Sequence, residues 1–474
     1  MITLEEAKKN SERLLELRRY FHENPAVTGH EEKTIEKISS ILTEDGIDHE
    51  VIKDGGILAY IYGKGYEPEA GHEPWKEGYV EDGDSTLLKD GCGKNNLTLS
   101  WKMKTVLLRA DVDALYVKES DTNLCKKKVC VSKDENVSHA CGHDSHIAMV
   151  LCAAEYLNNH RDDIKGRVII MFERGEEGPN NIIFIIRRMI EKNLHIDSVC
   201  AAHVYAGLSS GKVAAQEGPV MGGGVFYQVI IKGRGGHGSR PDMAANPIDC
   251  YTAVQEELNS FRGRYLDPFH TFTYAPTIVR AGALDNVIPG ELLFGGNARL
   301  YELSDGVKFR EFFFKTLDSL CPLYGCTYEV LYCVGPKIPV KNDRDCAALA
   351  KKAAAAAVGS ENVCEMEPWM ACESICTMLA IFPGVFLFVG NRNPEKGTGA
   401  IHHSPEFDVD EDVMPGGFAC EVNYVLSFLE NDVKPGHGWF DGSAADLYEV
   451  SNYNPGVVSM LRYGTPYQIT EGLR

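Results

Sequence analysis

The sequence predicts an α/β protein that carries a smaller α+β domain as an insertion. Helix and strand patterns alternate up to about Ala214, which is typical of a central sheet flanked by helices. From Gly222 the order becomes strand, helix, strand, strand, helix, strand, which is the ferredoxin-like arrangement. Helix and strand patterns at Ala347 to Val358 and Val385 to Val389 can then complete the first sheet. The smaller domain is therefore expected to interrupt the larger one.

The larger domain begins with a helix and continues with short buried strands. Thr3 precedes a helical pattern that runs toward His22, and a threonine side chain can cap such a helix. Later apolar runs have the length of buried strands: Thr105 to Ala110, Arg167 to Phe172 and Ser198 to Ala202.

The inserted domain is divided by clear turn and cap signals. Its strands are predicted at Val225 to Lys232, Thr271 to Arg280, Glu291 to Tyr301 and Thr327 to Cys333. A glycine-rich turn, Gly233 to His237, follows the first strand, and Asn246 with Pro247 marks the start of a helix. A second helix is expected within Gly306 to Leu320.

Composition limits the class of protein. The 474 residues are 44% hydrophobic, with no apolar run long enough to cross a bilayer. A net charge of -20 argues against nonspecific binding to nucleic acid or to an anionic membrane. Fifteen cysteines without a CxxC pair suit a reducing compartment. We therefore expect a cytoplasmic protein whose partner is a small molecule.

Residues that can bind metal follow several of the predicted strands. In the run His139-Ala-Cys141-Gly-His143-Asp144, a thiolate and an imidazole two residues apart can both reach one ion. The others are Asp111 and Asp113, Glu176 and Glu177, His203, and the pair His402-His403. Open α/β sheets place their sites at the carboxyl ends of strands. A single histidine or cysteine of this set is more readily explained as a satisfied core residue, but together the residues indicate a metal site.

The two adjacent glutamates are expected to have different roles. Neighbouring residues at a strand end or turn point in different directions, so one carboxylate can hold a metal while the other faces water. The alternative is a pair of solvated acidic residues in a turn. The mixed sulfur, nitrogen and oxygen donors fit Zn²⁺, although Mn²⁺, Co²⁺ and Ni²⁺ are also compatible.

Six ordered motifs resemble those of the M20 metallopeptidase family, within it the amidohydrolase branch that contains hippurate hydrolases, auxin-conjugate hydrolases and N-acyl-amino-acid deacylases. They are Leu108-Arg-Ala-Asp-Val-Asp-Ala-Leu115, His139-Ala-Cys-Gly-His-Asp144, Glu176-Glu-Gly178, Gly233-Arg-Gly-Gly-His237, Asn286-Val-Ile-Pro289 and His403-Ser-Pro405. The match runs roughly from Leu14 to Leu429. It implies a zinc-peptidase-like catalytic domain (1–218 and 334–432), a lid and dimerisation domain (219–333) and a C-terminal extension (433–474).

The resemblance also implies roles in the catalytic domain. It assigns the metal ligands as Cys141, His143, Glu177, His203 and His403, with two ions per subunit and Cys141 bridging them. Glu176 would be the general base, which moves a proton from water to the leaving amine. Asp113 would orient a histidine ligand such as His143. Asp111 could instead have no role in the site and only form a turn.

The lid would supply further groups. In the family, the histidine that matches His237 stabilises the oxyanion, often across the dimer interface. Asn286 and Arg299 are candidates for holding the amide and the carboxylate of the substrate, since arginine offers a fork that fits a carboxylate. The alternatives are a turn residue for Asn286 and a surface strand residue for Arg299.

This chain departs from the family pattern in several places. Glu173-Arg174-Gly175 stands where the branch usually has Gln-Pro-Ala, and Cys372-Glu373-Ser374 stands near its usual Ser-Glu-Asp-Phe. The segment from about 63 to 104 is longer than the expected hairpin. The aromatic residues of the C-terminal extension are expected to pack on the catalytic domain or to form an oligomer contact.

We therefore expect a metal-dependent amidohydrolase that cleaves N-acyl or N-aminoacyl amino acids and forms a homodimer through its lid. One alternative is a dipeptidase or carboxypeptidase that uses the same site. The other is a noncatalytic protein that binds a metal or an amino acid.

Overall fold

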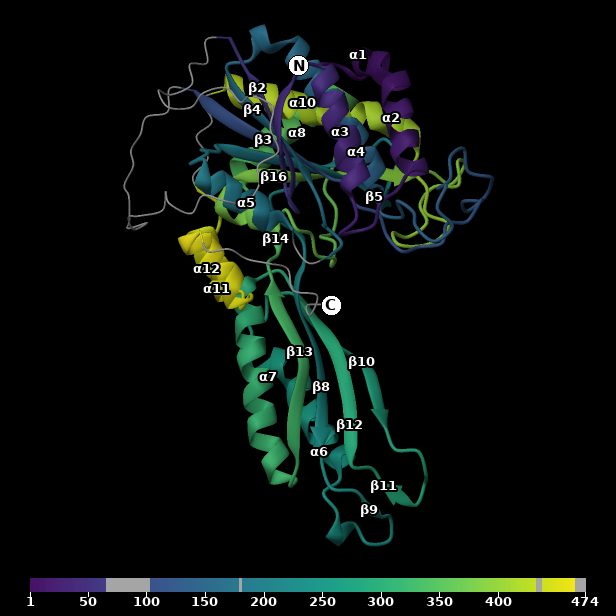
Figure 1. Ribbon diagram of the computed structural model, residues 1–474, viewed down its shortest axis with the longest axis vertical. Helices are drawn as coiled ribbons and strands as arrows, with labels where there is room; N and C mark the ends of the chain where they lie inside the picture. The colour runs from purple at the N-terminus through teal and green to yellow at the C-terminus, as the bar shows by residue number, and fades with distance from the viewer. Residues whose placement is uncertain (65–102, 179–180, 432–436, 465–474) are drawn as a thin grey trace.

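The computed structural model describes residues 1–64, 103–178, 181–431 and 437–464. Figure 1 shows two units: a broad one built on a large sheet, and a narrow one that projects from it. The inserted segment predicted at about 63–104 lies almost entirely outside the described residues.

The large sheet is mixed and has eight strands in the order β1-β2-β4-β3-β5-β16-β6-β15. Strands β3, β4, β5 and β16 run parallel at its centre. The bounds are β1 (Asp48–Ile52), β2 (Gly56–Tyr62), β3 (Lys104–Asp111), β4 (Gly166–Glu173), β5 (Ser198–Ser209), β6 (Val213–Ala214), β15 (Val363–Cys364) and β16 (Gly384–Arg392). Strand β16 pairs with β5, so the chain after the insertion completes the first sheet as predicted.

Helices cover both faces of this sheet because its strands alternate apolar side chains between two cores. Leu108 of β3 packs in one core and Leu107 in the other. The first core is covered by α2 (Ser11–Glu23), α3 (Glu32–Glu44), α4 (His143–Asn159), α8 (Arg344–Val358) and α10 (Met414–Glu430). The second is covered by α5 (Ile182–Glu191) and α9 (Cys376–Ile381). The chain begins with α1 (Leu4–Ala7), whose first turn Thr3 caps as predicted. The helix predicted to run toward His22 is divided, because a 3₁₀ turn over Lys8–Asn10 separates α1 from α2.

The smaller unit, residues 223–337, is a four-stranded antiparallel sheet with two helices on one face. The strand order is β10-β12-β8-β13. The bounds are β8 (Gly223–Lys232), α6 (Pro247–Tyr265), β10 (Phe272–Ala281), β12 (Glu291–Leu300), α7 (Leu303–Leu323) and β13 (Thr327–Lys337). This element order matches the sequence prediction, although β13 extends to Lys337 rather than ending at Cys333.

Two short strand pairs mark the ends of the smaller unit. Strand β7 (Gly218–Met221) pairs with β14 (Val340–Asn342) where the chain enters and leaves it. Strand β9 (Gly236–His237) pairs with β11 (Val287–Ile288) at the opposite end. Strand β9 lies inside the segment that was predicted as a glycine-rich turn.

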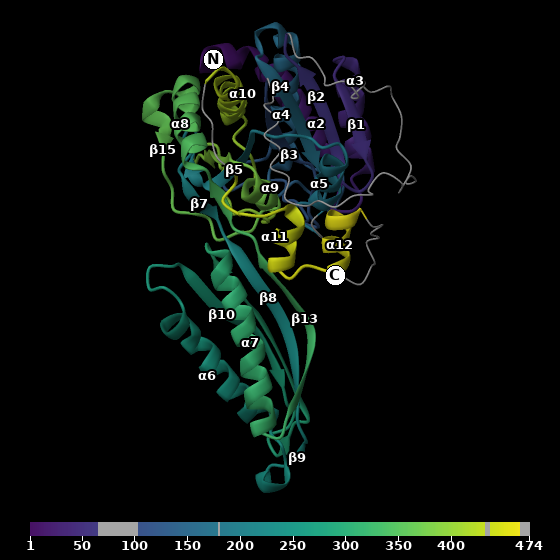
Figure 2. The ribbon, with the colours of Figure 1, turned by 90° about the vertical axis from the view of Figure 1, so that its left-hand side faces the viewer.

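The C-terminal segment forms α11 (Ala444–Val450) and α12 (Pro455–Tyr463). Both helices lie beside the broad unit below α5 and near the end of α7 (Figure 2). Leu447, Tyr448, Met460 and Leu461 are buried in the second core, so this segment packs on the catalytic part of the chain, one of the two outcomes expected for it. No helix in the described residues is long and apolar enough to cross a membrane. The cytoplasmic location stays a prediction.

Candidate metal centre and active site

A left-handed glycine brings Cys141 and His143 to the same place. Gly142 has φ of +94°, and a Cβ on it would lie 2.4 Å from a methyl group of Val204. Glycine is therefore needed for the sharp turn into α4, which begins at His143. The turn leaves the Cys141 sulfur and a ring nitrogen of His143 within 4.8 Å of each other.

The five predicted metal ligands lie together in three overlapping groups. Within each group the ligand atoms lie within 4.8 Å of one another. The groups are Cys141, His143 and His203; Cys141, Glu177 and His403; and His143, Glu176 and Glu177. Cys141, His143 and Glu177 each belong to two of these groups, so the groups form one continuous cluster of donors.

The two buried histidines present a free nitrogen to this cluster. The Nδ1 atom of His143 lies 2.9 Å from the carbonyl oxygen of Asp113, and the Nδ1 atom of His203 lies 2.6 Å from that of Val204. In the neutral ring each Nδ1 therefore donates, which leaves Nε2 with a lone pair. The Nε2 atom of His143 is buried without a hydrogen-bond partner, and that of His203 lies 3.6 Å from the Cys141 sulfur. The unpartnered Nε2 atom of His143, together with the neighbouring His203 nitrogen and Cys141 sulfur, fits a divalent metal ion.

The remaining pair lies closer to solvent. His403 has a left-handed backbone with φ of +66°, and its Nε2 atom lies 2.9 Å from Oε1 of Glu177. Its amide donates to the carbonyl oxygen of Ala140, which ties the loop after β16 to the Cys141 turn. The strained conformation thus brings a residue from a distant loop to the cluster.

Charges within the cluster shift several pKa values. Burial opposes the protonated form of His143, but the carboxylates of Asp111 and Asp113 raise its pKa to about 10. Burial and then the carboxylates of Glu177 and Glu176 raise the pKa of the Cys141 thiol. Excess negative charge of this kind attracts a cation.

Asp113 holds three groups of the centre at once. Its Oδ2 atom accepts hydrogen bonds from Thr28 Oγ1 at 2.5 Å and from the amide of Glu177 at 3.0 Å. Its Oδ1 atom lies 3.3 Å from Nδ1 of His143. These contacts agree with a role in orienting His143 and the Glu177 backbone.

Glu176 lies next to the ligand cluster and points toward a different partner from Glu177. Its Oε1 atom accepts a hydrogen bond of 3.2 Å from the amide of Ser374. Burial, followed by the charges of Glu373 and Glu177, raises the pKa of this carboxyl group. The two adjacent carboxylates therefore have different partners, the Ser374 amide for Glu176 and His403 for Glu177, although their ligand atoms lie within 4.8 Å of each other. Their separate roles stay a prediction.

Asp111 has structural partners rather than a turn role. It ends β3 inside the core, where Oδ1 accepts from Nδ1 of His146 at 2.7 Å. The Nε2 atom of His146 accepts from the amide of Val204 at 3.0 Å. Both nitrogens of His146 are thus occupied by protein partners. His402 accepts from the amide of Ala206 through Nε2, and its Nδ1 atom lies 3.8 Å from the Cys141 sulfur.

Arg109 organises a buried carboxylate network behind the site that sequence reasoning missed. Its guanidinium contacts Asp111 at 2.6 Å, Glu173 at 2.7 Å and Glu373 at 2.9 Å, and it donates to Ser374 Oγ at 2.9 Å. Glu173 and Ser374 are both departures from the family pattern, and they meet at this one arginine. The extra carboxylate therefore faces Arg109, and burial raises its pKa to about 7.

The three residues of the smaller unit that were predicted to contact substrate lie at two separate places. His237 in β9 and Asn286 beside β11 are exposed at the end farthest from the large sheet, and the amide of Gly238 donates to the Asn286 carbonyl oxygen. Arg299 lies at the opposite end of β12, where it donates to the sulfur of Cys372 at 3.0 Å. Within one chain, only Arg299 lies beside the broad unit.

The central strands of the large sheet are parallel, and sulfur, imidazole and carboxylate groups lie together beside the Glu176 carboxylate. This combination is typical of the metal centre of a hydrolase. The chain belongs to peptidase family M20/M25/M40, whose model matches residues 107–427. It is accordingly a hydrolase of amide bonds.

Known proteins of different named activities are similar to this chain along most of its length. Thermostable carboxypeptidase 2 of Saccharolobus solfataricus is 29% identical over 89% of this chain and 97% of its own. IAA-amino acid hydrolase ILR1-like 4 of Arabidopsis thaliana is 27% identical over 89% of this chain and 88% of its own. A solved Bacillus subtilis structure, described as a dinuclear metal binding peptidase from the M20 family, has a TM-score of 0.67 and 24% identity, and the alignment covers 89% of this chain and 99% of that one.

Proposed function

We propose that this protein is a metal-dependent amidohydrolase that releases a free amino acid from an N-acyl or N-aminoacyl amino acid. The observation that carries the proposal is the set of donor groups that share Cys141 and His143, with Glu176 beside them. Family membership supplies the reaction class. The IAA-amino acid hydrolase relative supports a substrate in which an acyl group is joined to an amino acid.

The ligands would be Cys141, His143, Glu177, His203 and His403, with Cys141 shared between two ions. Two observations support this assignment: the Nε2 atom of His143 has no hydrogen-bond partner, and Cys141 belongs to two of the donor groups. A divalent ion supplies a nucleophile from water near neutral pH and polarises the amide carbonyl. Zn²⁺ or Mn²⁺ fits these donors best, and Co²⁺ and Ni²⁺ remain compatible.

Glu176 would act as the general base. Its Oε1 atom is fixed by the Ser374 amide, so the carboxylate has a defined direction. It would accept a proton from water during attack on the carbonyl carbon and deliver that proton to the leaving nitrogen. Asp113 would keep His143 and Glu177 in place while this happens.

The smaller unit would act as a lid and as the dimerisation domain. Arg299 would bind the substrate carboxylate near Cys372. His237 and Asn286 are too far along this unit to serve the centre of their own chain, so we assign them to the centre of a second copy. His237 would stabilise the oxyanion, and Asn286 would hold the amide.

A carboxypeptidase or dipeptidase that uses the same centre is the second candidate. The similarity to a thermostable carboxypeptidase over nearly all of both chains favours it. The two candidates differ at the substrate's amino group: a peptidase of this kind accepts a free one, whereas the proposed amidohydrolase prefers an acylated one.

The test is amino-acid release by protein stripped of metal and then reloaded with Zn²⁺, Mn²⁺, Co²⁺ or Ni²⁺. Matched pairs such as N-acetyl and glycyl derivatives of one amino acid separate the two candidates. The Glu176→Gln variant should keep its metal content and lose about 10²- to 10⁴-fold in kcat. Glu12→Gln, an exposed change in α2, should leave turnover unchanged. Full activity in Glu176→Gln would remove the base assignment, and metal uptake without any release would favour the noncatalytic alternative.

A further inference from the structure

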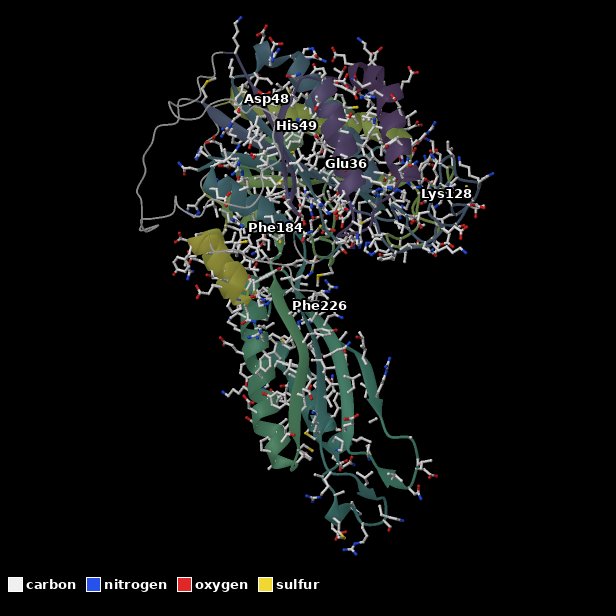
Figure 3. The ribbon with its side chains drawn as sticks, viewed as in Figure 1. Glu36, Asp48, His49, Lys128, Phe184 and Phe226 are labelled. Carbon is white, nitrogen blue, oxygen red and sulfur yellow. The ribbon has the colours of Figure 1, made fainter. Side chains whose placement is uncertain are left out.

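Two cations flank one glycine where the smaller unit meets the broad unit. Gly224 of β8 pairs with Arg299 of β12 on one side and with Lys337 of β13 on the other. Side chains of directly paired residues share a face of an antiparallel sheet, and so do residues two apart along a strand. Arg299, Lys337 and Phe226 therefore share the face opposite α6 and α7. Figure 3 shows Phe226 at the end of the smaller unit beside the broad unit.

The aromatic ring of Phe226 joins the two cations. The Arg299 guanidinium lies 4.6 Å from the ring centroid, and the Lys337 ammonium lies 5.6 Å from it. Glycine at 224 allows this close arrangement, because a Cβ there would lie 2.7 Å from the Ala298 carbonyl oxygen, 3.2 Å from Arg299 Cδ and 3.4 Å from Phe226 Cε2. The group is thus a defined arrangement in which one ring supports two positive charges.

Neither cation has a carboxylate partner among the described residues. Arg299 donates only to Asn297 Oδ1 at 3.2 Å and to the Cys372 sulfur at 3.0 Å, and no polar contact of the Lys337 ammonium is found. Elsewhere near the centre, the buried cations Arg109 and Arg174 face carboxylates. Two unpaired and partly exposed cations in a chain of net charge -20 leave a local positive site for an anion.

A short segment connects this site to the catalytic groups. Cys372, which contacts Arg299, is two residues before Ser374, whose amide holds Glu176. Trp369 in the same segment lies 5.8 Å from His203 between ring centroids, and its carbonyl oxygen accepts from the amide of Gly222. A substrate held by the cations would therefore lie next to the general base.

We propose that Arg299 and Lys337 together select a substrate with two carboxylates, namely an N-acyl derivative of glutamate or aspartate. Arg299 binds the α-carboxylate through its guanidinium fork, Lys337 binds the side-chain carboxylate as a point charge, and the methylene groups lie on Phe226. This inference rests on the proposed function and names the amino acid that it releases.

The experiment compares kcat and KM for N-acetylglutamate, N-acetylglutamine and N-acetylmethionine in metal-loaded protein. Glutamine has nearly the same shape as glutamate without the second charge. The native protein should prefer N-acetylglutamate over N-acetylglutamine by about 10- to 100-fold in kcat/KM. Lys337→Gln should abolish this preference through a higher KM for the glutamate derivative alone. Arg299→Gln should raise KM for all three substrates.

Lys308→Gln, an exposed lysine of α7, is the matched control and should leave the preference unchanged. Equal turnover of the glutamate and glutamine derivatives by the native protein would overturn the inference. A Lys337→Gln variant that loses all three activities equally would also overturn it, because that result indicates a structural role.

Calorimetry with N-acetylglutamate separates this inference from the proposed function. If no N-acyl amino acid is hydrolysed, the proposed function fails, yet the native protein should still bind N-acetylglutamate more tightly than Lys337→Gln does. Absence of binding, or equal binding by both proteins, would overturn the assignment of the two cations.

Discussion

Asp113 holds three parts of the chain together: the proposed metal ligand His143, the backbone of the proposed ligand Glu177, and Thr28 near the N-terminus. It contacts His143, the Glu177 amide and Thr28. Asp113→Asn keeps the size but removes the negative charge beside His143. We expect metal affinity to fall by about 10- to 100-fold, as for other groups that orient metal ligands.

Chelator competition with the purified protein measures this change. Asp121→Asn, at an exposed position, is the control and should bind metal as the native protein does. Unchanged affinity in Asp113→Asn would show that the backbone carbonyl oxygen of residue 113 alone orients His143.

At the residue scale, chemistry and position near predicted strands point to Cys141, Glu177 and His203 as candidate donors, and the structure brings them close together. The division of the two glutamates into ligand and base came from the family resemblance and stays a prediction. Arg109 and Ser374 could not be found in this way, because their importance comes from contacts over 264 and 265 positions of chain. Glu173 illustrates the same limit: its charge was visible, but its direction toward Arg109 was not.

Glu119 connects elements that frame the site. It contacts Nε2 of His22 in α2 at 2.9 Å, the ammonium of Lys128 at 2.8 Å and the amide of Ser132 at 2.7 Å. Burial would raise the pKa of Glu119, but His22 and Lys128 lower it to about 2. The carboxylate therefore stabilises the fold above pH 4.5, and this contribution is lost as pH falls toward 2.

Glu119→Gln should therefore destabilise the protein in a pH-dependent way. The shift corresponds to on the order of 3 kcal/mol of unfolding free energy at neutral pH. We expect the native protein to have the higher Tm at pH 7, and the difference should shrink as pH falls from 5 toward 3. Thermal melts of both proteins across this range measure it. A constant difference in Tm would contradict the pKa argument.

The C-terminal helices are elements whose packing partner the sequence left open. Leu447 of α11 is fully buried in the second core, and Tyr448 Oη lies 3.2 Å from Thr377 Oγ1 of α9. Leu447→Ala should lower the unfolding free energy by about 2 to 5 kcal/mol, because it leaves a cavity.

Urea unfolding measures this loss, and Val450→Ala is the control because Val450 is 46% exposed. An equal, small effect of both changes would indicate that α11 contributes little to the core. The aromatic composition of the C-terminal segment predicted that it would be buried. Only the folded structure shows that it packs against the second core and α9.

Element boundaries show where periodicity is a poor guide. Strand β5 continues to Ser209, so His203 lies inside it and does not follow its end. The run Gly233 to His237 was predicted as a turn, yet Gly236–His237 pairs with Val287–Ile288. Two-residue strands have no hydrophobic period, so pairing between distant segments decides them.

On the scale of the whole molecule, the proposed catalytic roles of His237 and Asn286 lead to the prediction of a second chain. His237 and Asn286 lie at the far end of the smaller unit, and the donor cluster lies in the broad unit (Figure 1). Strand β10 is the edge of the smaller sheet and exposes Val279. An exposed edge strand can pair with another chain. We therefore expect a homodimer through this unit, with light scattering as the direct measurement.

Mixing two inactive variants tests whether the centre is shared between chains. Glu176→Gln and His237→Ala should each be inactive alone as homodimers. In a hybrid dimer, one centre carries both changes, whereas the other combines a native Glu176 with a native His237 from the partner. Random reassembly of equal amounts makes half of the dimers hybrid, so about a quarter of native activity should return.

The measurement is turnover after the two variants are unfolded together and refolded, compared with each variant refolded alone. Two copies of one variant refolded together provide the control for refolding yield. If His237 served its own centre, every centre in every dimer would lack one of the two groups, and no activity would return. A monomeric protein would give the same absence, so light scattering on the refolded mixture distinguishes a wrong assignment of His237 from a missing dimer.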